Sequence, residues 1–86
     1  RFDRGLVLFN QGDGEGALAE FSRAYELSES PVVLWNLARV FSALGQPVAA
    51  VEALETLRAL SSLPDARRAE VRALFERETS RVATIE

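Results

Sequence analysis

The side chains that most often carry out catalysis are missing from this sequence. Its 86 residues include no histidine and no cysteine, which removes the usual general base, the commonest metal ligand and the thiolate nucleophile. Acidic pairs such as Glu52 and Glu55 remain, but the apolar pattern around them places both on the outward face of a helix, where nothing gives a carboxylate catalytic reactivity. We therefore expect no enzymatic activity, no cofactor and no metal site.

Five arginines near the C-terminal end could recognise an anion. They are Arg67, Arg68, Arg72, Arg77 and Arg81. Glu70, Glu76 and Glu78 interleave with them, and the pairing of Arg72 with Glu76 at i, i+4 is typical of an exposed, charged helical face. The whole chain has a net charge of −3. Because duplex binding needs a basic face, we expect no nucleic-acid partner.

A glycine-rich stretch at residues 12–16, Gly-Asp-Gly-Glu-Gly, is a further candidate for binding a phosphate or an ion. It lacks the Lys-Ser/Thr pair of a phosphate-binding loop and the oxygen-ligand spacing of a calcium loop. We interpret it as a turn.

The elements that position all these side chains follow from an internal repeat of 33 residues. Seven small, apolar or turn-forming residues recur at this interval. Gly5, Leu8, Gly12, Ala17, Phe21, Leu27 and Pro31 return as Ala38, Phe41, Gly45, Ala50, Leu54, Leu60 and Pro64. A repeat of this length with helical periodicity predicts a solenoid of helical hairpins, and such arrays present binding surfaces to other proteins.

Apolar spacing within the copies predicts five helices. They cover about residues 1–11, 14–28, 31–44, 47–60 and 64–80. Gly12 and Gly45 stand where glycine usually ends a helix, and Asp13 and Ser30 stand where a side chain can cap the next one. Because the connections are short, neighbouring helices must be antiparallel.

The predicted fold is therefore all-α, a right-handed helix-hairpin solenoid with two hairpins and a C-terminal capping helix. The repeat copies cover about residues 1–30 and 31–63, and the capping helix about 64–80. In the repeat register Ala38 becomes Val71, a branched residue, so we expect no further helix to cross closely over Val71. A polar outer face on the terminal helix keeps such an array soluble.

Each copy resembles the tetratricopeptide repeat, which places small, aromatic and glycine residues at fixed offsets on a helix pair. The matching residues are Gly5, Leu8, Gly12, Ala17, Phe21 and Ala24 in the first copy, and Leu37, Ala38, Phe41, Gly45, Ala50 and Leu54 in the second. The resemblance covers about residues 1–64. The copy is one residue shorter than the family's usual length of about 34, and Trp35 stands one place beyond the usual tryptophan position, which Leu34 occupies.

The resemblance implies a non-catalytic interaction module that binds a peptide or a helix in the concave groove lined by the first helix of each hairpin. Carried over by register, the groove residues are Phe2, Leu6, Asn10, Trp35, Asn36, Arg39, Ser42, Arg68 and Arg72. Some family members hold the C-terminal carboxylate of a peptide with asparagine and basic residues in these positions, which makes Asn36, Arg39 and Arg72 candidates for that role. The alternative is that Asn36 is structural and the arginines are solvated. Trp35 is either a ligand anchor or part of the core.

A second function stays open, that of a structural spacer that self-associates as a homodimer within a larger protein. Two repeats are fewer than the three that such arrays usually need for stability. The first helix also carries Phe2, Leu6, Leu8 and Phe9 around much of its circumference, so upstream residues, a partner protein or a second copy must cover some of them.

The wider context can be predicted only in outline. All ten basic residues are arginine, which is typical of a GC-rich bacterial genome. No apolar run approaches the roughly 20 residues that span a bilayer, so we expect no direct membrane insertion by this segment, while cytoplasm and periplasm both stay open. Residues 81–86 alternate and are rich in β-branched side chains. They are either a tail or the start of a strand, and such an ending resembles the entry into a PEGA-type β-domain in a bacterial multidomain protein.

Overall fold

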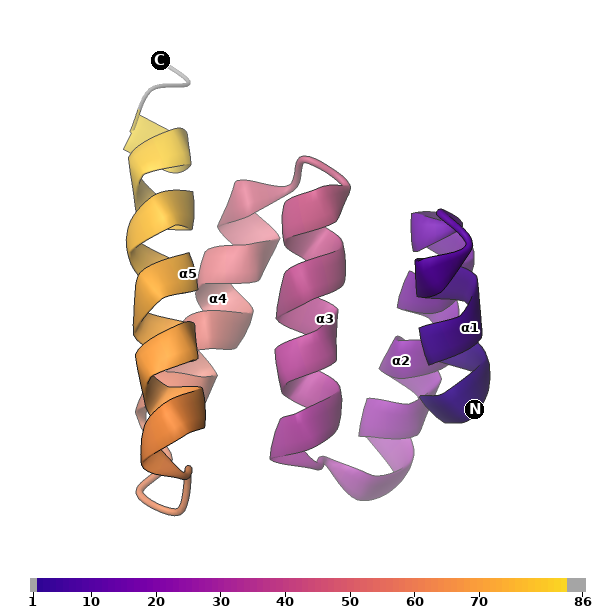
Figure 1. Cartoon of the computed structure of the whole chain (residues 1–86), viewed down its shortest axis with the longest axis horizontal. Helices are drawn as coiled ribbons and strands as arrows, with labels where there is room; N and C mark the ends of the chain where they lie inside the picture. The colour runs from indigo at the N-terminus through magenta and orange to yellow at the C-terminus, as the bar shows by residue number, and fades with distance from the viewer. Residues whose placement is uncertain (1, 84–86) are drawn as a thin grey trace.

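The computed structural model describes residues 2–83, without the side chains of the first and last of these, and they form five α-helices in a row (Figure 1). The helices are α1 (Phe2–Asn10), α2 (Gly14–Ser28), α3 (Pro31–Ala43), α4 (Pro47–Arg58) and α5 (Asp65–Ala83). Since residues 2–83 contain no strand, the prediction of an all-α hairpin array is confirmed.

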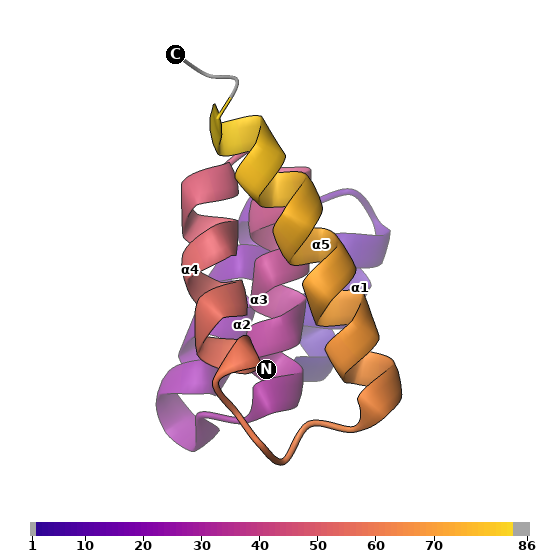
Figure 2. The ribbon, with the colours of Figure 1, turned by 90° about the vertical axis from the view of Figure 1, so that its left-hand side faces the viewer.

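Each helix packs against the helix that precedes it and the helix that follows it in the chain. In the view of Figure 2, α2 and α4 lie to one side, α1 and α5 to the other, and α3 between them. Two contacts link α1 to α3 and α3 to α5 directly. The guanidinium of Arg39 on α3 lies 5.3 Å from the ring centroid of Phe9 on α1, and that of Arg67 on α5 lies 5.0 Å from the ring centroid of Trp35 on α3. Thus α1, α3 and α5 share one face of the array.

Side-chain caps fix the starts of two helices where the sequence predicts them. An Asp13 carboxylate oxygen accepts a hydrogen bond of 2.9 Å from the backbone N–H of Gly16, and the Ser30 hydroxyl oxygen accepts one of 3.2 Å from the backbone N–H of Val32. Both bonds satisfy donors that the first turn of a helix leaves without a partner. The predicted caps of α2 and α3 are confirmed.

Glycine allows two close approaches between helices. A Cβ atom at Gly5 would lie 2.7 Å from Cε1 of Phe21, which is fully buried, so the absence of a side chain lets α1 rest directly on that ring. A Cβ atom at Gly14 would lie 2.7 Å from Cδ2 of Leu44 at the end of α3. These glycines set how closely α2 packs against the helices on either side of it.

The core runs along the centre of the array and follows the predicted apolar stripes. Its largest fully buried apolar side chains are Phe21, Val40, Leu54, Leu57 and Val71. Because Val71 is fully buried, α5 turns one face toward the core. Leu6, Leu8 and Phe9 of α1 are half-buried and pack against this core.

The end of α5 differs from the prediction. The helix continues through Arg81 to Ala83 instead of ending near residue 80, so Arg81 and Val82 are helical and do not begin a strand. A strand in the remaining residues, 84–86, lies outside the described residues. Within residues 2–83, no helix is long and apolar enough to cross a membrane.

Candidate functional site

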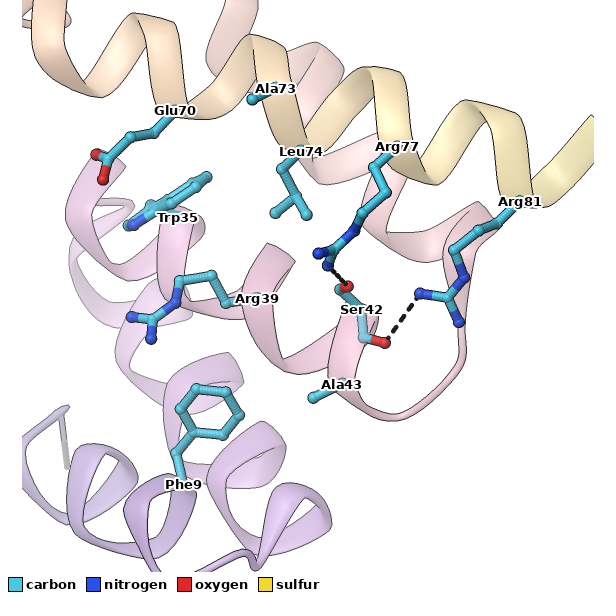
Figure 3. A pocket seen from close by; sticks show the side chains of 10 residues that line it. All are labelled: Phe9, Trp35, Arg39, Ser42, Ala43, Glu70, Ala73, Leu74, Arg77 and Arg81. Carbon is cyan, nitrogen blue, oxygen red and sulfur yellow. Dashed lines mark hydrogen bonds between the residues drawn. The ribbon is translucent and has the colours of Figure 1, made fainter.

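A pocket of about 590 Å³ lies on the shared face of α1, α3 and α5 (Figure 3). It is lined by one residue of α1, four of α3 and five of α5. They are Phe9; Trp35, Arg39, Ser42 and Ala43; and Glu70, Ala73, Leu74, Arg77 and Arg81. The spacing within α3 and within α5 corresponds to one side of each helix, so the two helices form opposing walls.

Of the residues that the family register assigns to the groove, Trp35, Arg39 and Ser42 line this pocket. The contribution of α1 comes from Phe9 and not from the assigned positions. Leu6 is half-buried against the core, and Asn10 is exposed outside the pocket. The side chain of Phe2 lies outside the described residues.

Asn36 is turned into the protein and away from the pocket. It is only 5% exposed, and its amide nitrogen donates a hydrogen bond of 2.8 Å to the backbone carbonyl of Val32. Its amide oxygen accepts a hydrogen bond of 3.1 Å from the Arg39 guanidinium. Asn36 therefore acts on the pocket indirectly, by holding Arg39 in place above the ring of Phe9.

Arg68 does not face the pocket either. Its guanidinium donates hydrogen bonds to the backbone carbonyls of Leu60 and Ser61, at 3.2 and 3.4 Å, and to that of Leu63, at 3.5 Å. These bonds close the connection between α4 and α5. The side chain thus satisfies backbone carbonyl groups of the loop that follows α4.

Arg72 is exposed and also lies outside the pocket, because α5 is rotated relative to the register copied from α3. In that register Phe75 would take the place of Ser42 on the pocket wall. Instead, Phe75 packs against the core, and the guanidinium of Arg58 on α4 lies 4.2 Å from its ring centroid. Burying this large ring turns Ala73 and Arg77 toward the pocket in place of Arg72.

Trp35 belongs to both the core and the pocket wall. It is 8% exposed and packs with the buried residues of α3 and α4, yet one side of it contributes to the pocket. The Arg67 guanidinium over its ring is a cation–π contact that ties α5 to α3. The two interpretations of this tryptophan are therefore compatible.

A buried carboxylate outside the pocket holds three of the residues that line it. Glu78 is fully buried, although the interleaved charges of α5 predict an exposed side chain. Its carboxylate accepts a 3.0 Å hydrogen bond from the Ser42 hydroxyl, a 3.3 Å bond from Nε of Arg77 and 3.0 Å bonds from Arg81. Arg77 also donates a 2.8 Å bond to the Ser42 hydroxyl oxygen. Figure 3 shows this bond as a dashed line, together with a 3.3 Å bond that Nη1 of Arg81 donates to the backbone carbonyl of Ser42.

The sequence contains a signal for this buried glutamate. Val71, Leu74, Glu78 and Val82 are spaced at i, i+3, i+7 and i+11, so Glu78 falls on the apolar stripe of α5. A charged residue on such a stripe needs partners, and here Ser42 and the neighbouring arginines supply them.

The side chains that line the pocket are suited to binding a ligand. Guanidinium groups of Arg39, Arg77 and Arg81 supply hydrogen-bond donors, and Phe9 and Leu74 supply apolar surface. In the part of the chain that the structure describes, no cluster of acidic residues could hold a metal ion, and no buried side-chain nitrogen or oxygen lacks a partner. Hydrogen bonds to Asn36, Ser42 and Glu78 position the arginines.

Residues 31–56, which span α3 and most of α4, match the family model of the tetratricopeptide repeat. This part of the chain therefore carries a tetratricopeptide repeat. No curated protein and no solved structure matches the chain. Tetratricopeptide repeats are protein–protein interaction modules, and the family is generally a non-enzymatic scaffold.

Proposed function

We propose that this chain binds an acidic peptide segment of a partner protein in the pocket between α1, α3 and α5. The observation that carries the proposal is the convergence of Arg39, Arg77 and Arg81 from two helices onto one open pocket, against a single lining glutamate, Glu70. The chain as a whole has a net charge of −3, so this basic region is local and not a consequence of composition.

Arginine suits a carboxylate ligand because its planar guanidinium can donate two parallel hydrogen bonds to the two oxygens. Arg39 is exposed, and its bond to Asn36 holds it at the pocket wall. The Arg77 side chain is 65% exposed although it also contacts Glu78. Side chains that are pre-positioned in this way lose less conformational freedom when a ligand binds.

Apolar surface beside the arginines supports a peptide ligand over a free anion. Phe9, Trp35, Ala73 and Leu74 line the same pocket, so a side chain next to the carboxylate would be removed from water on binding. The ligand class that fits is an acidic segment with neighbouring apolar residues.

Self-association of the chain stays a prediction, and the packing of α1 gives it less support than its sequence does. The core already covers part of the apolar surface of α1, because Leu6, Leu8 and Phe9 pack against it. Val7 is 52% exposed. The pocket offers a more specific surface than this single valine.

The test begins with selection of binders from a displayed library of random peptides, followed by calorimetry with a synthetic peptide of the selected sequence. We expect selected sequences to contain Asp or Glu, and Arg39→Gln to weaken binding about tenfold, which corresponds to about 1.4 kcal/mol for one lost charge-assisted hydrogen bond. Arg23→Gln is the matched control, because Arg23 is exposed on α2, away from the pocket. Selected peptides without acidic residues, or equal affinities for both variants, would refute the proposal.

A further inference from the structure

A second pocket lies at the other end of α3. Its volume is about 380 Å³, and its walls come from the start of α3, the connection between α4 and α5, and the start of α5. The lining residues are Pro31, Val32, Ser62, Leu63, Pro64, Ala66, Arg67 and Glu70. In Figure 1 the starts of α3 and α5 lie at the same end of the array.

This pocket differs in character from the arginine-lined one. Its walls are mainly proline and aliphatic side chains, and Val32 is 54% exposed to solvent even though it is apolar. Leu63 is buried behind it. An apolar side chain placed here would cover the exposed part of Val32 and remove both surfaces from water.

The two pockets adjoin, because Glu70 lines both of them. Val32 and Arg39 are seven residues apart on α3, which at about 1.5 Å per residue is about 10 Å along the helix axis. An extended peptide rises about 3.3 Å per residue, so about three residues cover this distance.

An ion pair at the junction favours an extended ligand over a helical one. Nη1 of Arg67 lies 2.7 Å from Oε1 of Glu70, and the two side chains remain 36% and 57% exposed. The pair therefore offers both a donor and an acceptor to a ligand backbone. An extended segment has free N–H and C=O groups to use them, whereas a helix satisfies these groups internally.

We propose that the second pocket is a subsite for an apolar side chain of the same ligand. The ligand is then an extended segment with an acidic group at Arg39 and Arg77 and an apolar side chain about three residues away, at Val32 and Leu63. This inference rests on the proposed function, and it adds a spacing that the arginine-lined pocket alone does not require.

Two valines provide a matched pair of variants. Val32 and Val48 are 54% and 55% exposed, and each follows a proline in the first turn of its helix, but only Val32 lines the pocket. We expect Val32→Ser to weaken binding of the selected synthetic peptide about fivefold, since part of an apolar contact is lost, and Val48→Ser to leave it unchanged. Circular dichroism shows whether both variants stay folded.

Peptide variants test the spacing independently. Insertion of glycines that doubles the distance between the acidic and the apolar residue is expected to weaken binding as much as replacing the apolar residue with serine. If Val32→Ser and Val48→Ser bind equally while Arg39→Gln is weakened, the subsite is refuted and the proposed function stands. If Arg39→Gln also binds like wild type, the proposed function itself fails.

Discussion

Replacing Glu78 with glutamine tests whether the buried carboxylate holds α5 onto α3. Glutamine keeps the volume of the side chain but replaces one carboxylate oxygen with an NH₂ donor. That donor would face the Ser42 hydroxyl or the guanidinium groups of Arg77 and Arg81, which are donors themselves. We therefore expect Glu78→Gln to destabilise the fold while leaving the rest of the core intact.

The expected cost follows from the number and exposure of the lost contacts. A hydrogen bond to a charged group contributes about 1.5–3 kcal/mol, and the fully buried Glu78 cannot recover it from water. The side chains of Arg77 and Arg81 are 65% and 40% exposed, so they regain hydration when the carboxylate is removed. We expect the free energy of unfolding to decrease by about 2 kcal/mol, which lowers the Tm of a domain of this size by about 10 °C.

Thermal unfolding followed by circular dichroism measures this loss, with Glu76→Gln as the control. Glu76 lies on the same helix and undergoes the same chemical change, but it is exposed, so its effect should stay within about 0.5 kcal/mol. The reasoning is wrong if both variants melt at the same temperature, because the network of Glu78 would then contribute nothing to the attachment of α5.

Two further predictions concern helix packing and capping. Gly5→Ala places a Cβ atom 2.7 Å from the buried ring of Phe21. Overpacking lowers the free energy of unfolding, and the better helix propensity of alanine offsets about 1 kcal/mol of this, so we expect a net decrease of about 1 kcal/mol. A urea midpoint at or above the wild-type value would contradict this expectation. Ser30→Ala removes the hydrogen bond to the N–H of Val32 and should cost about 1 kcal/mol in the same urea titration, an expectation that fails if the midpoint does not move.

The helices were predictable because local signals define their ends. Asp13 and Ser30 cap α2 and α3, and Gly12 and Gly45 adopt left-handed φ values of +85° and +73° just past α1 and α3. Each of these signals acts within one turn of the chain, so the sequence is enough to place it. The end of α5 has no comparable stop signal near residue 80, and the helix continues to Ala83.

The pocket was less predictable because it depends on how α5 rotates against its neighbours. Copying the register of α3 assumes that every helix turns the same side toward the pocket. Phe75 breaks that assumption, since burial of its ring under Arg58 decides the rotation. The contact between Ser42 and Glu78 joins residues 36 positions apart, and no local pattern identifies such a pair.

The position of Trp35 gives the chain a built-in optical probe. It is the sole tryptophan of the sequence, it is 8% exposed, and the Arg67 guanidinium of α5 covers its ring. Arg67 lines the apolar pocket, while Trp35 itself lines the arginine-lined one. The fluorescence of Trp35 therefore reports on two events without an attached dye. One is the packing of α5 against α3, and the other is the binding of a ligand in the pocket.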